Sequence, residues 1–285
     1  MSAKFGPAGN SDAFSAVHKS SLAAPQWIAE QGLDCYEYQC GKGVHVGEDT
    51  ARRVGENARK HGISLSLHAP YFINLANPDP DSLQKTIGYI TSACLVASQM
   101  GASRVVIHSG ALMKRTRREA LDTALRSLRE VIRTCDGQGF GHIALCPETM
   151  GKINQLGDLE EVLELCTLDE RLIPCIDFGH LYARSLGADD GAEAFGRMLD
   201  RVESVLGQSR ASVFHSHFSH IQFTPGGGEK CHRTFDDDDG YGPDWAPLAR
   251  AIARRGWSPT FICESAGTQA EDAQAMKRMY QEARG

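Results

Sequence analysis

The stretch RVVIHSGALMKRTRREALDTALRSLREVIRTCDGQGFGHIALCPE, residues 104–148, decides the fold class. It opens with an apolar run that ends in His108 and closes with a second run that ends in Glu148. Between the two runs, apolar residues recur at the spacing of one helix face. They are Leu121, Ala124, Leu125, Leu128, Val131 and Ile132. A short strand, an amphipathic helix and another short strand form the unit from which helix-covered parallel sheets are built.

The same alternation extends along the chain in both directions. Eight short runs read as strands, and amphipathic segments separate them. The runs are Lys4–Phe5, Asp34–Glu37, Ser64–His68, Arg104–His108, His142–Glu148, Leu172–Asp177, Ser212–His217 and Thr260–Glu264. Eight such units favour an α/β fold, a single (β/α)8 TIM barrel formed as one domain over residues 1–285. A doubly wound sheet is the alternative, but the glycine-rich segment 6–10 lacks the GxGxxG spacing of a dinucleotide-binding turn.

Two helix starts carry a sequence signature. Asp158 with Glu161, and Thr268 with Glu271, have the spacing of a capping box, in which two side chains satisfy free backbone amides reciprocally. Each pair follows a strand and its loop, as expected for the helical half of a β/α unit.

Composition narrows the class of protein. The 285 residues include 30 Lys and Arg against 36 Asp and Glu, so the net charge of −6 argues against gripping nucleic acid by bulk charge. The nine cysteines are scattered without a CxxC pair, which predicts reduced thiols and a cytoplasmic location. We expect no membrane contact, because no apolar run reaches the ~18 residues of a membrane span and the N-terminus lacks a signal-like apolar region.

Six consecutive strand candidates end in a residue type that binds metals. These residues are His68, His108, Glu148, Asp177 with His180 shortly after it, His217 and Glu264. Because the carboxyl ends of barrel strands share one rim, we expect the side chains to converge. Any one of them alone is more often a hydrogen-bonded loop residue or an ion-pair partner. Together, converging carboxylates repel each other and are costly to bury unless a divalent cation offsets their charge.

The donor types favour zinc or manganese over a structural thiolate site. They are too many for one tetrahedral ion, so we expect a cluster in which Glu148 bridges two ions. His215 lies two residues before His217 on the same strand face, so either histidine could be the ligand of this strand.

Loops near the predicted rim could extend the site. The glycine-rich run 226–228 precedes His232 and would let a loop fold back over the rim. The acidic run Asp236–Asp239 is most simply a solvated turn, unless it pairs with basic residues or reaches a metal. A basic run follows His108, and it is either a solvated helix start or a phosphate contact. The basic residues are Lys114, Arg115, Arg117 and Arg118.

An aromatic pair, Tyr71-Phe72, follows His68 by a few residues. Such a pair usually covers the core. If it is exposed instead, it would form a wedge on which nucleic-acid bases stack.

These motifs resemble the endonuclease IV (deoxyribonuclease IV) family of zinc-dependent apurinic/apyrimidinic endonucleases, within the xylose-isomerase-like TIM-barrel superfamily. The segment 68–75, HAPYFINL, is similar to the strand-three motif, in which a ligand histidine precedes residues that probe DNA. The segment 176–180, IDFGH, is similar to the Asp-x-x-His motif. The resemblance spans about residues 68–264, which is most of the chain.

The resemblance implies a role for each matching residue. The implied metal ligands are His68, His108, Glu148, Asp177, His180, His217, His232 and Glu264. The implied catalytic residues are the bridging and terminal glutamates, Glu148 and Glu264. The implied DNA-binding residues are Tyr71, Phe72, Lys114, Arg115 and Arg117.

The implied activity is metal-assisted hydrolysis of the phosphodiester 5′ of an abasic site, a step of base excision repair. The substrate is damaged double-stranded DNA, and the products carry a 3′-hydroxyl and a 5′-deoxyribose phosphate. The cofactor is Zn²⁺, two or three per chain, with Mn²⁺ as another option. We expect a monomer with no obligate protein partner.

The chain also departs from the family pattern. Lys230 stands where the family has an aspartate two residues before the last histidine. A third ion would keep His180 and His232 but would need Glu229 or one of Asp236–Asp239 as its carboxylate. The segment 6–9, GPAG, replaces the histidine-containing start of the family's first strand loop.

A sugar isomerase or epimerase of the same superfamily is the alternative. Such an enzyme uses one divalent ion held by Glu, Asp, His and Glu, a pattern that Glu148, Asp177, His217 and Glu264 also satisfy. The acidic net charge favours this alternative, but it leaves His68, His108 and His232 unexplained. A non-catalytic metal-binding barrel is a third interpretation. Metal stoichiometry separates the first two, because the nuclease needs two or three zinc ions and the isomerase needs one ion.

Overall fold

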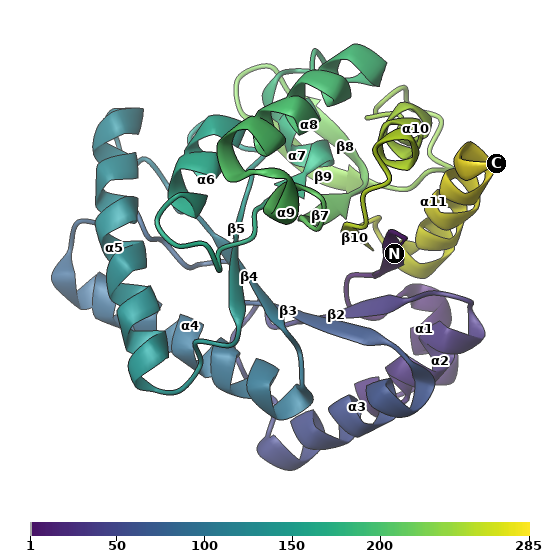
Figure 1. Ribbon diagram of the computed structural model, residues 1–285, viewed down its shortest axis with the longest axis horizontal. Helices are drawn as coiled ribbons and strands as arrows, with labels where there is room; N and C mark the ends of the chain where they lie inside the picture. The colour runs from purple at the N-terminus through teal and green to yellow at the C-terminus, as the bar shows by residue number, and fades with distance from the viewer. Residues whose placement is uncertain (1) are drawn as a thin grey trace.

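A computed structural model describes residues 2–285 as a ring of strands surrounded by helices (Figure 1). The strands of the ring are β1 (Lys4–Pro7), β2 (Cys35–Gln39), β3 (Ser64–His68), β4 (Arg104–His108), β5 (Ala144–Glu148), β6 (Cys175–Asp177), β7 (His215–Phe218) and β10 (Thr260–Cys263). All of the paired neighbours in the ring run parallel, in the order β1-β10-β7-β6-β5-β4-β3-β2. The predicted (β/α)8 TIM barrel is confirmed.

Helices form the outer layer between consecutive strands. They are α1 (Asp12–Val17), the 3-10 helix η1 (Ser21–Ala23), α2 (Ala24–Glu30), α3 (Glu48–His61), α4 (Pro80–Met100), α5 (Arg117–Gly137), α6 (Leu159–Cys166), α7 (Phe178–Arg184), α8 (Gly191–Leu206), α9 (Gln208–Ala211), α10 (Trp245–Arg255) and α11 (Gln269–Arg284). Across residues 2–285, no helix has the combination of length and apolar character that crossing a bilayer requires.

The ring closes between β1 and β2. The backbone of Ala8 pairs with Glu37, and the amide of Gly9 donates a hydrogen bond of 2.9 Å to the Glu37 carbonyl. A Cβ atom on Gly6 would lie 1.7 Å from the Cys35 carbonyl oxygen, so only glycine allows this approach. The segment 6–9, which departs from the family pattern, therefore takes part in closing the ring.

Alternate side chains of each strand point into the barrel. Leu65 and Leu67 of β3 belong to the main core between strands and helices, whereas Ser66 and His68 occupy the other side of the strand. Inside the barrel, Val106, Cys146 and Cys175 form a small separate cluster. The strand register consequently directs the last inward residue of each strand to the same rim.

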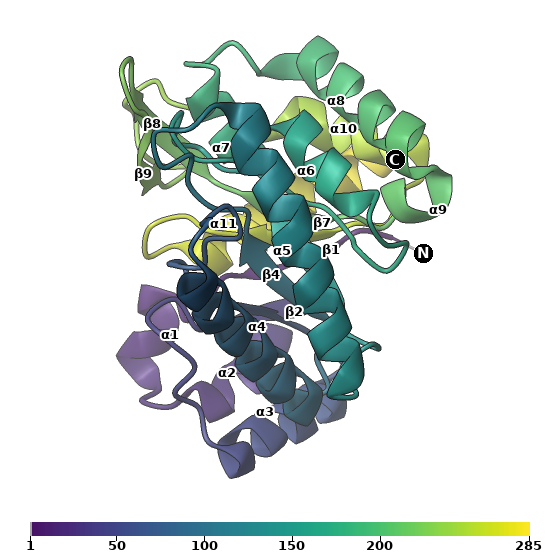
Figure 2. The ribbon, with the colours of Figure 1, turned by 90° about the vertical axis from the view of Figure 1, so that its left-hand side faces the viewer.

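One element lies outside the ring. Strands β8 (His220–Thr224) and β9 (Gly228–Arg233) form an antiparallel hairpin after β7. The hairpin projects from the end of the barrel opposite the N-terminus (Figure 2). Residues 225–227 form its turn and Gly228 begins β9, so the predicted loop over the rim is a folded two-stranded sheet.

One of the two predicted capping boxes is confirmed. Asp158 and Glu161 bond each other's backbone amides at the start of α6. The prediction for Thr268 is wrong, because its side chain makes no cap bond and its Oγ1 instead donates to Asp272 Oδ2 at 3.0 Å. The same Asp272 oxygen also accepts from the Phe235 amide at 3.0 Å.

Candidate metal centre

Glu148, the last residue of β5, lies at the centre of the rim and is buried. Its Oε2 atom lies 3.3 Å from Nε2 of His68 and 3.2 Å from Nε2 of His108. Its Oε1 atom lies 2.9 Å from Nδ1 of His217. The two carboxylate oxygens therefore face two different groups of imidazole nitrogens, which is the arrangement a bridging ligand requires.

The other ring nitrogens of His68 and His108 are fixed by backbone carbonyls. Nδ1 of His68 lies 2.7 Å from the Ala69 carbonyl oxygen, and Nδ1 of His108 lies 2.8 Å from that of Tyr71. A carbonyl only accepts, so each Nδ1 carries a proton, and an unprotonated Nε2 would direct its lone pair at Glu148. Lone pairs facing a carboxylate are favourable only with a proton or a cation between them.

A second group of donors shares Glu148. Ligand atoms of Glu148, Asp177, His217 and Glu264 lie within 4.8 Å of one another. Asp177 Oδ2 is buried without a hydrogen-bond partner, although such atoms are normally satisfied. Burial raises the pKa of Asp177, and the neighbouring charge of Glu264 raises it further. An unsatisfied carboxylate oxygen among other carboxylates fits a divalent cation at this position.

A third group lies between the barrel and the hairpin. Ligand atoms of His180, Glu229 and His232 lie within 4.8 Å of one another. Nδ1 of His180 bonds the Thr149 carbonyl at 2.8 Å, and Nε2 lies 3.5 Å from Glu229 Oε2. Nδ1 of His232 lies 2.8 Å from Ser219 Oγ. The carboxylate of this group is thus Glu229 rather than a residue at position 230.

Backbone pairing holds Glu229 in place. The Glu229 amide donates to the Gly151 carbonyl at 3.1 Å, and Lys152 forms an antiparallel bridge with Gly228. Gly228 has φ +74°, and a Cβ on it would lie 2.3 Å from the Gly151 oxygen. The hairpin is therefore joined to the loop after β5, which starts at Glu148.

The electrostatics of the rim favour cations. Burial alone would lower the pKa of His68, but the hydrogen bond and charge of Glu148 raise it to about 9. Burial likewise opposes protonation of His180, and the charge of Asp177 raises its pKa to about 9. Burial would raise the pKa of Glu148, yet His217 and the other imidazoles hold it well below its ordinary value. The carboxylates that raise the pKa values of His68 and His180 also attract metal ions.

His215 and His217 occupy different levels of the barrel. His217 contacts Glu148 at the rim, whereas Nε2 of His215 lies 2.8 Å from Glu37 Oε2 in the layer below. Burial lowers the pKa of His215 to about 4. Of the two alternatives that the sequence left open, only His217 reaches the rim donors.

Residues 25–282 match the family described as xylose isomerase-like TIM barrel. The chain belongs to this family. The match covers nearly all of the described ring, including every strand that contributes a rim donor.

Relatives of this xylose isomerase-like barrel carry several names. An uncharacterized protein of Methanocaldococcus jannaschii is 30% identical over 238 residues, which is 84% of each chain. A probable endonuclease 4 of Acholeplasma laidlawii is 27% identical over 165 residues, or 55% of this chain and 54% of the relative. The chain thus matches only about half the length of that endonuclease.

Solved structures show the same fold at low identity. A D-tagatose 3-epimerase-like protein superposes with a TM-score of 0.73 at 18% identity, covering 99% of this chain and 98% of the other. Endonuclease IV from Thermus thermophilus superposes with a TM-score of 0.68 at 18% identity, covering 98% and 99%. Names of both enzyme types therefore occur among proteins with this barrel.

The predicted DNA-contacting aromatic residues lie at the mouth of this xylose isomerase-like barrel. Tyr71 is 57% exposed and Phe72 is 44% exposed, although large aromatic side chains are usually covered. Their ring centroids lie 5.6 Å apart. Tyr71 also lines the cavity that contains the metal-ligand candidates.

The basic run after β4 divides into two kinds of residue. Lys114 is exposed, with φ +62°. Arg115 donates to the Ala76 carbonyl and to Thr123 Oγ1. Arg117 donates from Nε to Glu161 Oε1 at 2.7 Å. The structure thus leaves Lys114 free for a ligand and engages both arginines in internal contacts.

The contacts of the acidic run Asp236–Asp239 are with neighbouring residues of its own segment. Asp239 pairs with Arg233 at 2.7 Å, and Asp237 accepts from the Thr234 amide. Neither contact reaches the residues of the rim groups, in agreement with a solvated turn.

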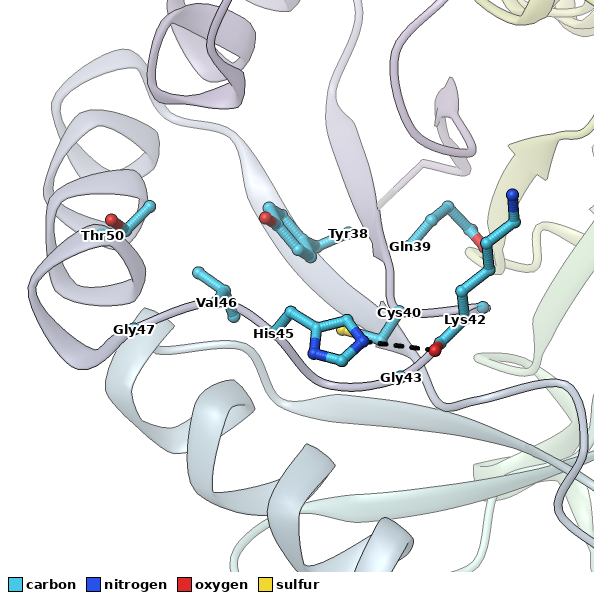
Figure 3. A pocket seen from close by; sticks show the side chains of 10 residues that line it. Tyr38, Gln39, Cys40, Lys42, Gly43, His45, Val46, Gly47 and Thr50 are labelled. Atoms are coloured by element: carbon cyan, nitrogen blue, oxygen red, sulfur yellow. Dashed lines mark hydrogen bonds between the residues drawn. The ribbon is translucent and has the colours of Figure 1, made fainter.

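Two adjoining cavities open at the rim. One, of about 350 Å³, is lined by rim donors together with Tyr71, Lys152 and Gln155. The other, of about 560 Å³, lies along the loop 40–47 after β2, where His45 Nε2 lies 3.3 Å from the Lys42 carbonyl (Figure 3). They share Gln39 and Gly41, so a ligand larger than the metal centre has room beside it.

Sequence reasoning missed Glu37, which is fully buried under the rim. It also did not single out Gln39 or Lys152 as cavity residues. A signal existed for Glu37: in the strand CYEYQ it shares the inward face with Cys35 and Gln39, and a charged residue at a buried strand position needs a partner.

Proposed function

We propose that this protein is a metal-dependent endonuclease that hydrolyses the phosphodiester 5′ of abasic sites in DNA. The observation that carries the proposal is the presence of three donor groups around Glu148. One ion would use Glu148, Asp177, His217 and Glu264. His68 and His108 on the opposite oxygen of Glu148, and the group His180, Glu229 and His232, have no role in a one-ion enzyme.

The donors fit zinc, with manganese as the other option. They are imidazoles and carboxylates without a thiolate at the rim, and Asp177 Oδ2 accepts no hydrogen bond, with Nδ1 of His180 at 3.1 Å. Glu148 with His68, His108, Asp177, His217 and Glu264 would hold two ions, and the group His180, Glu229 and His232 would hold a third. Ions so placed supply Lewis acidity and an activated water for phosphodiester hydrolysis.

The chain's own residues would position the DNA. Tyr71 and Phe72 stand exposed at the mouth, where they could stack on bases beside the missing one. Extruding an abasic nucleotide costs little because no base must be unstacked. Lys114 and Lys152 are exposed near the rim and could neutralise phosphates, despite the net charge of −6. Glu148 and Glu264 are the proposed catalytic residues.

A sugar epimerase or isomerase is the second candidate. It is supported by the four-donor group Glu148, Asp177, His217 and Glu264, and by the structural likeness to epimerases. It leaves His68, His108 and the Glu229 group without a function, and we therefore rank it second.

The decisive test combines metal analysis with a nicking assay. Zinc-loaded protein should bind two or three ions and nick a duplex that holds one tetrahydrofuran abasic analogue. A chelator should abolish nicking, and an intact duplex should stay whole. Glu148→Gln is the matched inactive variant. An intact abasic duplex at full zinc loading, with conversion of a ketose at one bound ion, would instead establish the epimerase.

A further inference from the structure

A buried carboxylate lies beneath the candidate metal centre and is not among its ligand groups. Glu37 of β2 has no exposed surface. It occupies the interior layer that barrels usually fill with branched apolar side chains. A charge at that position needs partners, and the structure gives it several.

Both oxygens of Glu37 are occupied. Oε1 lies 2.9 Å from Nε2 of His217 and accepts from Gln39 Nε2 at 3.2 Å. Oε2 lies 2.8 Å from Nε2 of His215 and accepts from Ser66 Oγ at 2.8 Å. Glu37 is thus a carboxylate inside the barrel that only accepts hydrogen bonds.

The neighbours fix where the protons lie. Arg104 lies 3.5 Å from Nδ1 of His215, and a guanidinium only donates, so Nδ1 of His215 accepts. The proton of a neutral His215 is therefore on Nε2, facing Glu37. His217 meets Glu37 in the same way through Nε2, and its Nδ1 faces Glu148 and Glu264.

We propose that Glu37 is a positioning residue of the metal centre, holding the proton of His217 on Nε2 so that the Nδ1 lone pair faces the ions. The inference rests on the proposed function only in requiring that the Glu148 group binds metal. Carboxylates that bond the far nitrogen of a ligand histidine fix its tautomer and ring orientation. His215 and Ser66 in turn hold the carboxylate in place.

The test is the metal affinity of Glu37→Gln, measured by competition with a chromophoric chelator. The variant keeps the size of the side chain, but it loses the charge and brings an amide N–H toward an imidazole N–H. Affinity of the Glu148 group for Zn²⁺ should fall about 10–100-fold. The group His180, Glu229 and His232 should retain its affinity and acts as an internal control. Ser66→Ala, which removes one donor but keeps the carboxylate, is the matched variant and should change affinity less than Glu37→Gln.

A second measurement does not depend on whether the variant folds. In ¹⁵N-histidine-labelled wild-type protein loaded with zinc, long-range ¹H–¹⁵N spectra should show His217 protonated on Nε2. The opposite tautomer would overturn the proposal. Unchanged affinity in Glu37→Gln, or equal weakening of both groups, would also overturn it. Wild-type protein that binds no zinc at the Glu148 group would instead refute the proposed function.

Discussion

Glu229 Oε2 lies 3.5 Å from Nε2 of His180, although the two residues belong to different elements of the molecule. His180 sits in α7 directly after a barrel strand, and Glu229 sits in the hairpin strand β9. Glu229 supplies the carboxylate that Lys230 does not, so the third donor group contains two imidazoles and a carboxylate. Several consequences can be measured.

Replacing Glu229 by Gln should remove the third ion selectively. The amide keeps the shape but loses the charge that balances a cation between two imidazoles. Metal analysis after dialysis should give about one ion fewer per chain than wild type. Asp237→Asn, on the exposed turn of the same region, is the control and should keep the full complement. Equal metal content in E229Q and wild type would refute the assignment.

Gly228 should matter for the same ion without being a ligand. A methyl group there would meet the Gly151 carbonyl and would also force an unfavourable positive φ on alanine. Gly228→Ala should therefore displace Glu229 and weaken the third ion, with little effect on the Glu148 group. Gly226→Ala is a close control, because nothing lies near its added Cβ. Chelator competition measures the metal affinity of the third group in both variants. Equal affinities in Gly228→Ala and Gly226→Ala would show that the backbone pairing does not position Glu229.

Truncating the aromatic pair should weaken DNA binding but not metal binding. Base stacking on an aromatic ring contributes about 1–3 kcal/mol per base, so Tyr71→Ala and Phe72→Ala should each raise the Kd for an abasic duplex about 5–150-fold. Fluorescence anisotropy measures the Kd. Val17→Ala, at an apolar side chain that is 67% exposed, should leave it unchanged. Full DNA affinity in both aromatic variants would exclude the wedge.

Substitution of Lys114 should affect DNA binding, whereas substitution of Arg117 should affect the stability of the fold. Lys114→Ala should lower the slope of log K against log salt by about one, because one phosphate contact is lost. Arg117→Ala should instead lower the free energy of unfolding by about 1–3 kcal/mol, because Glu161 is buried and loses a charged partner. Salt titrations and urea unfolding of both variants measure the two effects. A stability loss in Lys114→Ala, or none in Arg117→Ala, would contradict the structural assignment.

Closure of the ring should depend on Gly6. Alanine there would place Cβ 1.7 Å from a backbone carbonyl, so the strands must separate. We expect Gly6→Ala to cost about 3 kcal/mol or more of unfolding free energy, the upper end for overpacking. Gly88→Ala, in open space on α4, should be neutral or stabilising by up to about 1 kcal/mol. Equal urea midpoints for the two variants would show that β1 does not need glycine.

The sequence predicts the barrel and its rim well for a physical reason. Each strand is short and enclosed, so its apolar run marks it, and His68, His108 and Glu148 fall on the last residue of β3, β4 and β5. Strand ends shared by one rim then imply proximity without any knowledge of the loops. Predicted and observed boundaries coincide at Ser64–His68 and at Arg104–His108.

The rest depends on contacts that no local pattern encodes. The hairpin β8–β9 is set by pairing with the loop after β5, so Glu229 could be named only as one of several possible carboxylates. Arg115 and Arg117 read as a basic patch, but their partners Ala76 and Glu161 lie about 40 residues away in sequence. Glu37 carries a local signal, a charge on the inward face of a strand, but its partners Ser66, His215 and His217 lie far away in sequence.

The hairpin that carries Glu229 and His232 is a separate unit attached to the closed barrel. Its strands pair with each other and with the loop after β5, and the Ile221 amide donates to the Gly242 carbonyl, so reshaping the hairpin would alter the donors of the third group without rebuilding the ring. The same barrel could thereby serve one-ion and three-ion chemistry. Grafting this hairpin onto a one-ion barrel is a direct way to examine how such a transition proceeds.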